Sequence, residues 1–231
     1  MSDSMPRAPE YNLTRSQRQS IAIYIRDGAV LVRAPLRMPA RDIDAFVASK
    51  EEWIADKLAA SRERVKRRAA FAPHYGDAVL FRGTEYPLVA RAGTRAGFDG
   101  ACFYLPPELA PARIKPLLVR LYRKLARIHL TDRVARFAAY MNVTPAAVGI
   151  TAAKTRWGSC SARRRLSFSW RIVFADDAVI DYVVVHELAH ITEMNHSARF
   201  WSIVAGVLPD WRERRARLAA LQERLGSENW E

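Results

Sequence analysis

The stretch that decides the fold runs from Ile180 to His190: Ile-Asp-Tyr-Val-Val-Val-His-Glu-Leu-Ala-His. Its apolar residues recur at helical spacing, which outweighs the strand propensity of three consecutive valines and predicts a helix. Asp176 or Asp177 can cap the start of this helix, and Asp181 favours its positive end. The sequence therefore places two histidines and a glutamate on one helix.

His186 and His190 lie four residues apart on this predicted helix. A helix turns about 100° and rises about 1.5 Å per residue, so both imidazoles lie on one face and can reach one ion. Glu187 lies on the same side and can reach a water on that ion without being a ligand. Buried histidines satisfied by hydrogen bonds are the alternative, which the cost of burying polar groups among valines disfavours. The pattern is typical of a zinc site in which the glutamate takes a proton from water.

A catalytic zinc takes three protein ligands and keeps a fourth position for water. We expect His196 to be the third ligand, provided that the helix ends soon after Ile191 and the chain turns back. Asn195 tolerates the left-handed conformation of such a turn, and Ser197 can cap the next helix. Spacing and turn residues therefore agree on His196.

Other residues compete for the third position. Glu193 lies on the face of His186 but too far along the axis if the helix continues, and Asp210 binds only if the last helix folds back. His74 and His129 have no comparable sequence context. We expect them to be ordinary surface or half-buried histidines.

Five segments, one of them in this helix and the others on either side of it in the sequence, resemble one family. They are Thr155-Arg-Trp-Gly-Ser-Cys160, Leu166-Ser-Phe-Ser-Trp-Arg171, Ile180–His190, and Asn195-His-Ser-Ala-Arg-Phe-Trp201 with Pro209-Asp-Trp211. Together they are similar to the YgjP-like metallopeptidases, which are close to the SprT-like group of zinc-dependent peptidases. The match is dense over residues 150–212 and weaker before them.

The resemblance implies a minimal zincin-like core with a short sheet, a metal-binding helix and a third histidine in the Asn-His-Ser turn. By that similarity His186, His190 and His196 bind zinc, and Glu187 is the general base in the hydrolysis of peptide bonds. We therefore expect a zinc metallopeptidase (a hydrolase) that acts on a protein or peptide substrate.

Two departures qualify the resemblance. Better-known zincins with the same histidine spacing have glycine three residues after the second histidine, where this chain has Glu193, so we expect Asn195 to be the pivot of the turn. SprT-like proteases commonly carry a cysteine-rich zinc ribbon, which two cysteines cannot form. The second departure disfavours a role in repairing DNA–protein crosslinks.

The segment Trp157-Gly-Ser-Cys160 is expected to be a turn with two interpretations. Either it lines the cleft, where a peptide adds as an extra strand, or Trp157 and Cys160 pack beneath a glycine turn, which is the favoured interpretation. A group that stabilises the oxyanion is also expected. The candidates, none of them favoured, are Tyr182, Arg156 and Arg171, whereas core positions are expected for Phe200, Trp201 and Trp211.

The whole chain predicts an α+β fold. We expect a β-rich N-terminal lobe over residues 1–105, with hairpins at Asp27-Gly28 and Gly83-Thr84, a helix from Asp42 to about Arg64, and an exposed loop at Arg91–Gly100. The metallopeptidase core is expected over residues 106–231. Its predicted elements are a long helix after Pro111 with Ile128 on its apolar face, strands at Val148–Ala153 and Arg165–Phe174, the helix with His186, and two further helices ended by Pro209 and Gly226.

The formal net charge is +13, from 37 Lys and Arg against 24 Asp and Glu, which favours anionic partners such as nucleic acid. The basic residues gather in the run Arg62–Arg68 and on one helix face, at Arg120, Arg123, Lys124, Arg127, Arg133 and Arg136. Solvated helix faces are the favoured interpretation. A nucleic-acid-associated protease is the alternative function, and a non-catalytic zinc-binding module is another.

Targeting and redox signals are sparse. The first nine residues hold no apolar stretch that could serve as a signal peptide, and no segment approaches the roughly 20 apolar residues that span a bilayer. Cys102 and Cys160 alone cannot form a disulfide framework. We therefore expect a cytoplasmic protein without a membrane partner.

Overall fold

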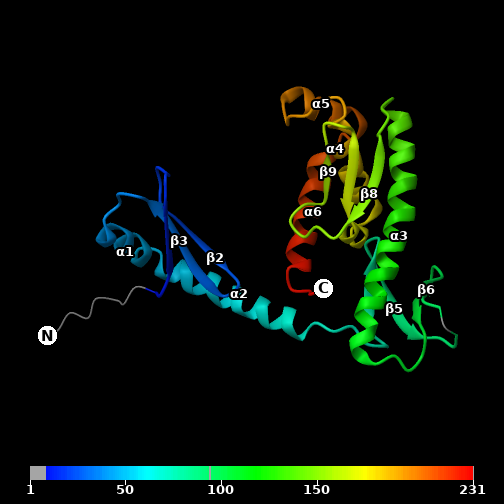
Figure 1. The fold of residues 1–231 in the computed structure, drawn as a ribbon, viewed down its shortest axis with the longest axis horizontal. Helices are drawn as coiled ribbons and strands as arrows, with labels where there is room; N and C mark the ends of the chain where they lie inside the picture. The colour runs from blue at the N-terminus through cyan, green and yellow to red at the C-terminus, as the bar shows by residue number, and fades with distance from the viewer. Residues whose placement is uncertain (1–8, 94, 231) are drawn as a thin grey trace. The chain divides into compact units, whose positions relative to one another are not determined.

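The structure is a computed structural model of the 231-residue chain, and it describes residues 9–93 and 95–230. Contacts divide the chain into two compact units (Figure 1). The first unit extends to Phe71 and includes Gly226–Asn229, and the second contains Ala72–Leu225 and Trp230. The expected boundary between an N-terminal lobe ending at residue 105 and a metallopeptidase core beginning at residue 106 stays a prediction. The first eight residues, where we expected no signal peptide, lie outside the described part.

The described residues form six α-helices and three small sheets. Each sheet combines a parallel pair of strands with at least one antiparallel pair, so the chain is a mixed α/β protein. Within the described ranges, none of the helices is both long and apolar enough to cross a membrane. The finer expectation, a β-rich lobe followed by a zincin-like core, stays a prediction.

The first unit holds a sheet of order β1-β3-β2, made of β1 (Asn12–Ser16), β2 (Ala22–Arg26) and β3 (Ala29–Pro35). The hairpin expected at Asp27-Gly28 is confirmed, because β2 and β3 pair in antiparallel register across it. The φ angles of Asp27 and Gly28 are 46° and 77°, which suits a two-residue hairpin turn with left-handed residues at both positions.

Two helices follow this sheet where one was expected. They are α1 (Ala40–Ala48) and α2 (Glu51–Ala70). The Ser49 hydroxyl donates to the carbonyl of Phe46 at 2.7 Å, an alternative to helix continuation that serine favours, and the chain breaks there. The two helices bury Ile43, Val47 and Ile54, which form the core of the unit together with Val30, Val32 and Ala34 of β3.

The second unit begins with a sheet of order β4-β5-β7-β6, from β4 (Ala78–Phe81), β5 (Thr84–Ala90), β6 (Gly97–Phe98) and β7 (Phe103–Leu105). The second predicted hairpin is confirmed, with its turn at Arg82-Gly83. The loop expected at Arg91–Gly100 contains the short strand β6. That strand is held by packing of Phe98 on Phe103, with ring centroids 4.6 Å apart, which local sequence did not indicate.

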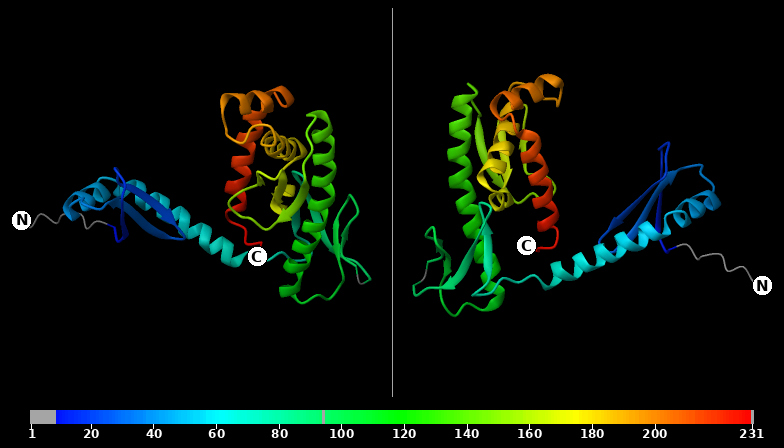
Figure 2. Two further views of the ribbon diagram at one scale, coloured as in Figure 1. Left: turned by 45° about the horizontal axis from the view of Figure 1, so that its top comes forward. Right: turned by 180° about the vertical axis from the view of Figure 1, so that it is seen from behind.

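A 30-residue helix, α3 (Pro111–Tyr140), crosses the second unit and packs along the metal-helix candidate α4 (Asp177–Ala189) (Figure 2). Two side-chain expectations on α3 are wrong. Ile128 is 60% exposed instead of facing the core. Arg133 is only 13% exposed at its side chain, because it pairs with Asp177 and Asp181 on α4.

The second sheet of this unit has the order β8-β10-β9. Its strands are β8 (Ala147–Thr151), β9 (Gly158–Cys160) and β10 (Arg165–Ser169). The strand expected up to Phe174 ends at Ser169 and continues as the 3-10 helix η1 (Trp170–Phe174). Trp170 stacks on Tyr122 of α3 at 5.8 Å between ring centroids, so tertiary packing overrides the strand propensity of this segment.

Three helices close the fold: α4, α5 (Ala198–Val207) and α6 (Trp211–Leu225). Asp176 caps α4 as expected, since its carboxylate accepts from the Val179 amide at 3.2 Å. Nine of the thirteen residues of α4 are buried. This central helix is therefore enclosed by the rest of the second unit, and it carries His186 and Glu187 into the interior.

Candidate metal centre

The chain reverses direction directly after α4. The helix ends at Ala189 with His190 as its C-cap, and α5 begins after Ser197, whose hydroxyl accepts from the Phe200 amide at 3.2 Å. His196 thus lies in the turn between two helices, as the sequence predicted. The cap on Ser197 is confirmed.

The turn itself is built differently from the expectation. The amides of Ile191 and Thr192 each bond to a carbonyl three residues back, at 3.0 Å, which tightens the last turn of the helix. Asn195 is not among the described non-glycine residues with positive φ, so its expected left-handed conformation is wrong. Helix-end hydrogen bonds rather than a left-handed residue bring His196 back.

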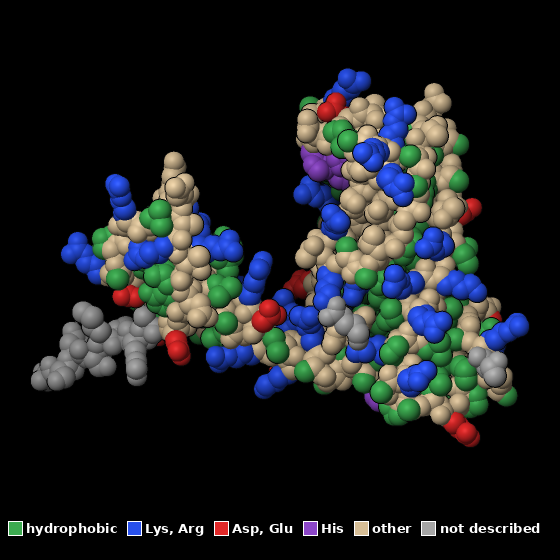
Figure 3. All heavy atoms as spheres, in the orientation of Figure 1, with side chains coloured by type: hydrophobic (Ala, Val, Ile, Leu, Met, Phe, Trp, Pro, Cys, Tyr) green, Lys and Arg blue, Asp and Glu red, His purple; other side chains and the backbone are tan. Residues whose placement is uncertain are grey.

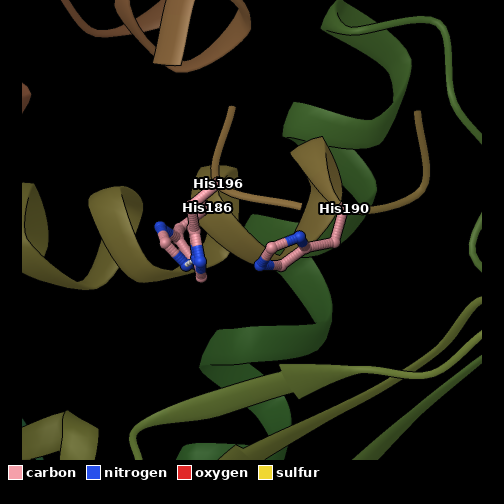
Figure 4. A group of neighbouring side chains, drawn as sticks. All are labelled: His186, His190 and His196. Atoms are coloured by element: carbon pink, nitrogen blue, oxygen red, sulfur yellow. Dashed lines mark hydrogen bonds between the residues drawn. The ribbon is translucent and has the colours of Figure 1, made fainter. Parts of the chain in front are cut away.

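The three histidines converge at this point (Figure 4). One ring nitrogen from each of His186, His190 and His196 lies within 4.8 Å of the others. The Nε2 atoms of His186 and His196 are 3.0 Å apart. Two nitrogens that share one tetrahedral zinc ion are about 3.3 Å apart, from bonds of about 2.0–2.1 Å. The spacing therefore suits three ligands of one small cation.

Hydrogen bonding and protonation of the rings also fit a metal. The Nδ1 atom of His190 lies 3.1 Å from the Glu193 carbonyl oxygen, so it donates there and leaves the Nε2 lone pair free. Burial, and then the neighbouring His190 and His196, lowers the pKa of His186 from 6.5 to about 3. Burial likewise lowers the pKa of His190. Both rings are neutral near pH 7, which is the protonation state that binds metal.

Glu187 lies beside the histidines but outside their group. It is 5% exposed, and burial raises the pKa of its carboxyl from 4.5 to about 7, with Arg156 opposing the shift. A carboxyl with a pKa near the working pH can both accept and return a proton. The structure thus brings the predicted base to the predicted ligands.

Two pockets meet at Glu187. The first, here called the histidine pocket, has a volume of about 290 Å³ and is lined by Gly158, Ser159, Cys160, His186, Glu187, His190, Met194 and His196. The second, here called the Leu218 pocket, has a volume of about 180 Å³ and is lined by Trp157, Gly158, Tyr182, Val183, His186, Glu187 and Leu218. Gly158, His186 and Glu187 line both pockets, so the two pockets adjoin at these residues.

Of the segment Trp157–Cys160, which was expected to be a turn, Gly158–Cys160 form strand β9; among the described strands it is an edge strand that pairs with β10 alone. Trp157 and Cys160 line the two pockets, so the cleft-lining interpretation is the one that the structure supports. Burial and the charge of Glu187 raise the pKa of the Cys160 thiol. The thiol donates to the Ser161 carbonyl at 3.6 Å. Cys160 is therefore protonated, which is not the form that binds metal.

The competing residues lie outside the group of potential ligands. Both carboxylate oxygens of Asp210 accept from Arg214 at 2.9 Å, and Glu193 contributes only its carbonyl group to His190. His74 lies 3.7 Å from Asp77, and His129 lies 3.2 Å from Asp177. The group of potential ligands among the described residues contains none of these four.

Of the three oxyanion candidates, the structure brings Tyr182 into the cleft. Its ring lies 5.9 Å from that of His186, and it lines the Leu218 pocket. Arg171 instead donates to the Ala152 carbonyl at 2.8 Å. Arg156 is exposed and acts on Glu187 through its charge.

Aromatic rings hold the imidazoles from the α5 side. Phe200 is fully buried with its ring centroid 4.5 Å from that of His190. Trp201 stacks on His196 at 5.7 Å and on Trp211 at 4.2 Å. Phe200 and Trp211 are core residues as expected, whereas Trp201 is half-buried. Histidine side chains form a patch at the surface beside α5 (Figure 3).

Sequence reasoning missed several cleft residues. Leu218 comes from α6, whose helical spacing was recognised without any signal for which face meets the cleft. Met194 lies in the turn, where no periodicity applies. Gly158 was noted only as a turn residue, although a Cβ atom added to it would lie within 2.8 Å of the Glu187 side chain.

Two solved structures of metallopeptidase zymogens are similar to part of this chain. The chain shares 20% identity with the crystal structure of the metallopeptidase zymogen of Pyrococcus abyssi abylysin, at a TM-score of 0.38 over 43% of this chain and 97% of that one. The corresponding values for the zymogen of Methanocaldococcus jannaschii jannalysin are 20%, 0.36, 39% and 94%. Similarities at this level carry no argument about this chain. No curated protein matches it.

A family model identifies the family of this chain. The model described as "YgjP-like, metallopeptidase domain" matches residues 19–221, which is most of the chain. The matched range includes the three converging histidines and Glu187. This chain belongs to the YgjP-like metallopeptidase family.

Proposed function

We propose that the chain is a zinc-dependent peptidase in which His186, His190 and His196 hold the metal and Glu187 is the general base. The observation that carries the proposal is the convergence of three imidazoles beside a buried carboxyl that is not part of their group. Three protein ligands leave one position open, as catalytic zinc requires. Nitrogen ligands of this kind favour zinc among common divalent ions.

The chain's own residues supply the proton transfers. A zinc ion held by the three histidines would polarise the scissile carbonyl and lower the pKa of the water molecule bound to it. Glu187, with its pKa near 7, accepts a proton from water and then delivers it to the leaving amine. His190 is held in its ligand tautomer by the Glu193 carbonyl, which fixes the ring orientation.

The substrate is proposed to be an extended peptide. Strand β9 is an edge strand that lines both pockets, so a peptide can hydrogen-bond to its free edge beside Glu187. Trp157, Val183 and Leu218 give the Leu218 pocket largely apolar walls. This pocket therefore suits an apolar side chain of the peptide.

The two alternatives have less support. A structural zinc site takes four protein ligands, whereas the group in the described residues contains three. Nucleic-acid association stays a prediction. Of the six residues on the predicted basic face of α3, Arg133 is paired with two aspartates, while the other five are exposed.

The test is Glu187→Gln, which keeps the shape of the side chain and removes its basicity. We expect zinc content of one ion per chain in both proteins and cleavage of a peptide library reduced about 10²–10⁴-fold in the variant. The surface substitution Glu63→Gln, on exposed α2, is the control. Full activity of Glu187→Gln would contradict the role of Glu187, and a closed four-ligand zinc in a crystal structure would contradict catalysis.

A further inference from the structure

Gly158 on β9 lies against the side chain of Glu187. A Cβ atom added to Gly158 would lie 2.6 Å from Cγ, 2.6 Å from Oε1 and 2.8 Å from Cδ of Glu187. Real Cβ atoms do not approach other heavy atoms so closely, so any larger residue forces one side to move. The carboxyl of Glu187 therefore occupies the space that a side chain at position 158 would fill.

The backbone of Gly158 does not itself require glycine. Gly158 is not among the glycines with positive φ, and it pairs with Phe168 in the antiparallel ladder of β9 and β10. Any L-residue can adopt this extended conformation. Sterically, then, what distinguishes glycine here is its lack of a side chain toward Glu187.

The backbone at Glu187 has little room to retreat, so only the side chain can move. It belongs to α4, and its helix neighbours Val183, Val184 and Leu188 are buried. Helix α4 is packed against β9 and also against α3, α5 and α6. A displaced carboxyl would have to leave its place at the junction of the two pockets.

We propose that Gly158 is a positioning residue for Glu187, a role that rests on the proposed function of Glu187 as the base. The missing side chain lets the carboxyl lie at the junction of the histidine pocket and the Leu218 pocket. A proton acceptor displaced by about 1 Å costs on the order of 10²-fold in rate. Gly158 thus sets the reactivity of Glu187 without touching the metal.

The experiment compares Gly158→Ala with Gly149→Ala in the full-length zinc-loaded protein. Gly149 lies on β8 of the same sheet, and a Cβ there would lie 3.6 Å from the Ser167 hydroxyl, which is an ordinary contact. For Gly158→Ala we expect kcat to fall about 100-fold, with KM and the zinc content per chain unchanged. Gly149→Ala keeps all three. Equal kcat for the two variants overturns the proposal.

A shortened base tests whether the collision is the cause. Aspartate at position 187 withdraws the carboxyl by one methylene from the added Cβ. We expect Glu187→Asp to lower kcat in the Gly149→Ala background and to leave it unchanged or raise it in the Gly158→Ala background. Losses that multiply equally in both backgrounds overturn the proposal.

Two readouts do not depend on activity. A crystal structure of metal-free Gly158→Ala should show the Glu187 carboxyl displaced, and an unmoved carboxyl refutes the positioning role even if Glu187→Gln is inactive. Conversely, an active Glu187→Gln refutes the proposed function whatever the crystal shows. If Gly158→Ala unfolds, adding Glu187→Ala should restore the thermal unfolding temperature, because it removes the atoms that collide. A double variant that stays unfolded overturns the proposal.

Discussion

The Nδ1 atom of His190 lies 3.1 Å from the carbonyl oxygen of Glu193, three residues further along the chain. This hydrogen bond spans the end of α4, so the turn that stops the helix also sets the tautomer of the ring. The same turn returns His196 to His186. The turn that ends α4 therefore also sets the positions of His190 and His196 relative to His186.

His196, the exposed member of the three proposed ligands, should be replaceable without loss of the fold. We expect His196→Ala to weaken zinc binding by more than about 100-fold, because losing a ligand exceeds the 10–100-fold cost of losing an outer partner. The thermal unfolding temperature of the metal-free protein should not change, since His196 is exposed. Zinc content after dialysis and calorimetry measure both. His74→Ala, outside the site, is the control, and His196→Ala with stoichiometric zinc would disprove the assignment.

The buried carboxyl should give a distinct pH dependence of stability in the metal-free protein. The pKa of Glu187 rises to about 7 in the folded state from 4.5. Between these values the folded chain keeps a proton that the unfolded chain has lost, so the contribution of Glu187 to stability is present below pH 4.5 and is lost as pH rises through 7.

Comparison with Glu187→Gln isolates this contribution, because the two proteins differ in this one carboxyl group. The difference in unfolding free energy, wild type minus variant, should fall between pH 4.5 and 7, with a slope of at most about 1.4 kcal/mol per pH unit. Urea titrations at several pH values measure it. A difference that stays constant over this range would show that the pKa of Glu187 is not raised.

Arg133 should be important for stability rather than for surface charge. It pairs with Asp181 at 2.8 Å and with Asp177 at 2.6 Å, and its side chain is 13% exposed. We expect Arg133→Met to destabilise the fold by about 3 kcal/mol, because it leaves the mostly buried Asp181 carboxylate without its partner. Arg127→Met, an exposed site on the same helix, should change stability by less than about 0.5 kcal/mol. Equal urea midpoints for the two variants would refute this.

The Leu218 pocket should control which peptides are cleaved. Leu218→Arg places a long cation among apolar walls, so we expect a higher KM for peptides with an apolar side chain at this position and an unchanged zinc content. Cleavage of a peptide library by mass spectrometry measures the preference. Ala219→Arg, exposed on the same helix, adds the same charge outside the pocket. An identical preference in both variants would exclude the pocket from substrate binding.

Periodicity and spacing were enough to predict the elements that carry the site. The helix with His186, the cap at Asp176 and the two hairpins follow from rules that act over a few residues, and all are found. The convergence of His196 followed from a geometric argument, because an unbroken helix would have carried it out of reach. That argument required a turn without specifying its hydrogen bonds, and so the conformation assigned to Asn195 was wrong.

The remaining errors come from tertiary contacts. Trp170–Phe174 has the composition of a strand but forms a 3-10 helix, because Trp170 packs on Tyr122 from a distant helix. Arg133 looked like a surface cation because its partners lie more than forty residues away on α4. Gly158 gave no signal of its contact with Glu187, since a glycine in a sequence does not show what occupies the space beside it.

The enclosure of α4 has a consequence for how the metal arrives. The helix is capped by Asp176 and tied to α3 through Arg133, so folding alone brings His186 and His190 into place. The proposed metal ion would therefore bind to histidines that are already in position, and it would enter from the side of the exposed His196. A chelator should thus yield a protein that is inactive but fully folded. When zinc is added back, activity should return at a rate limited only by diffusion of the ion and loss of its hydration shell.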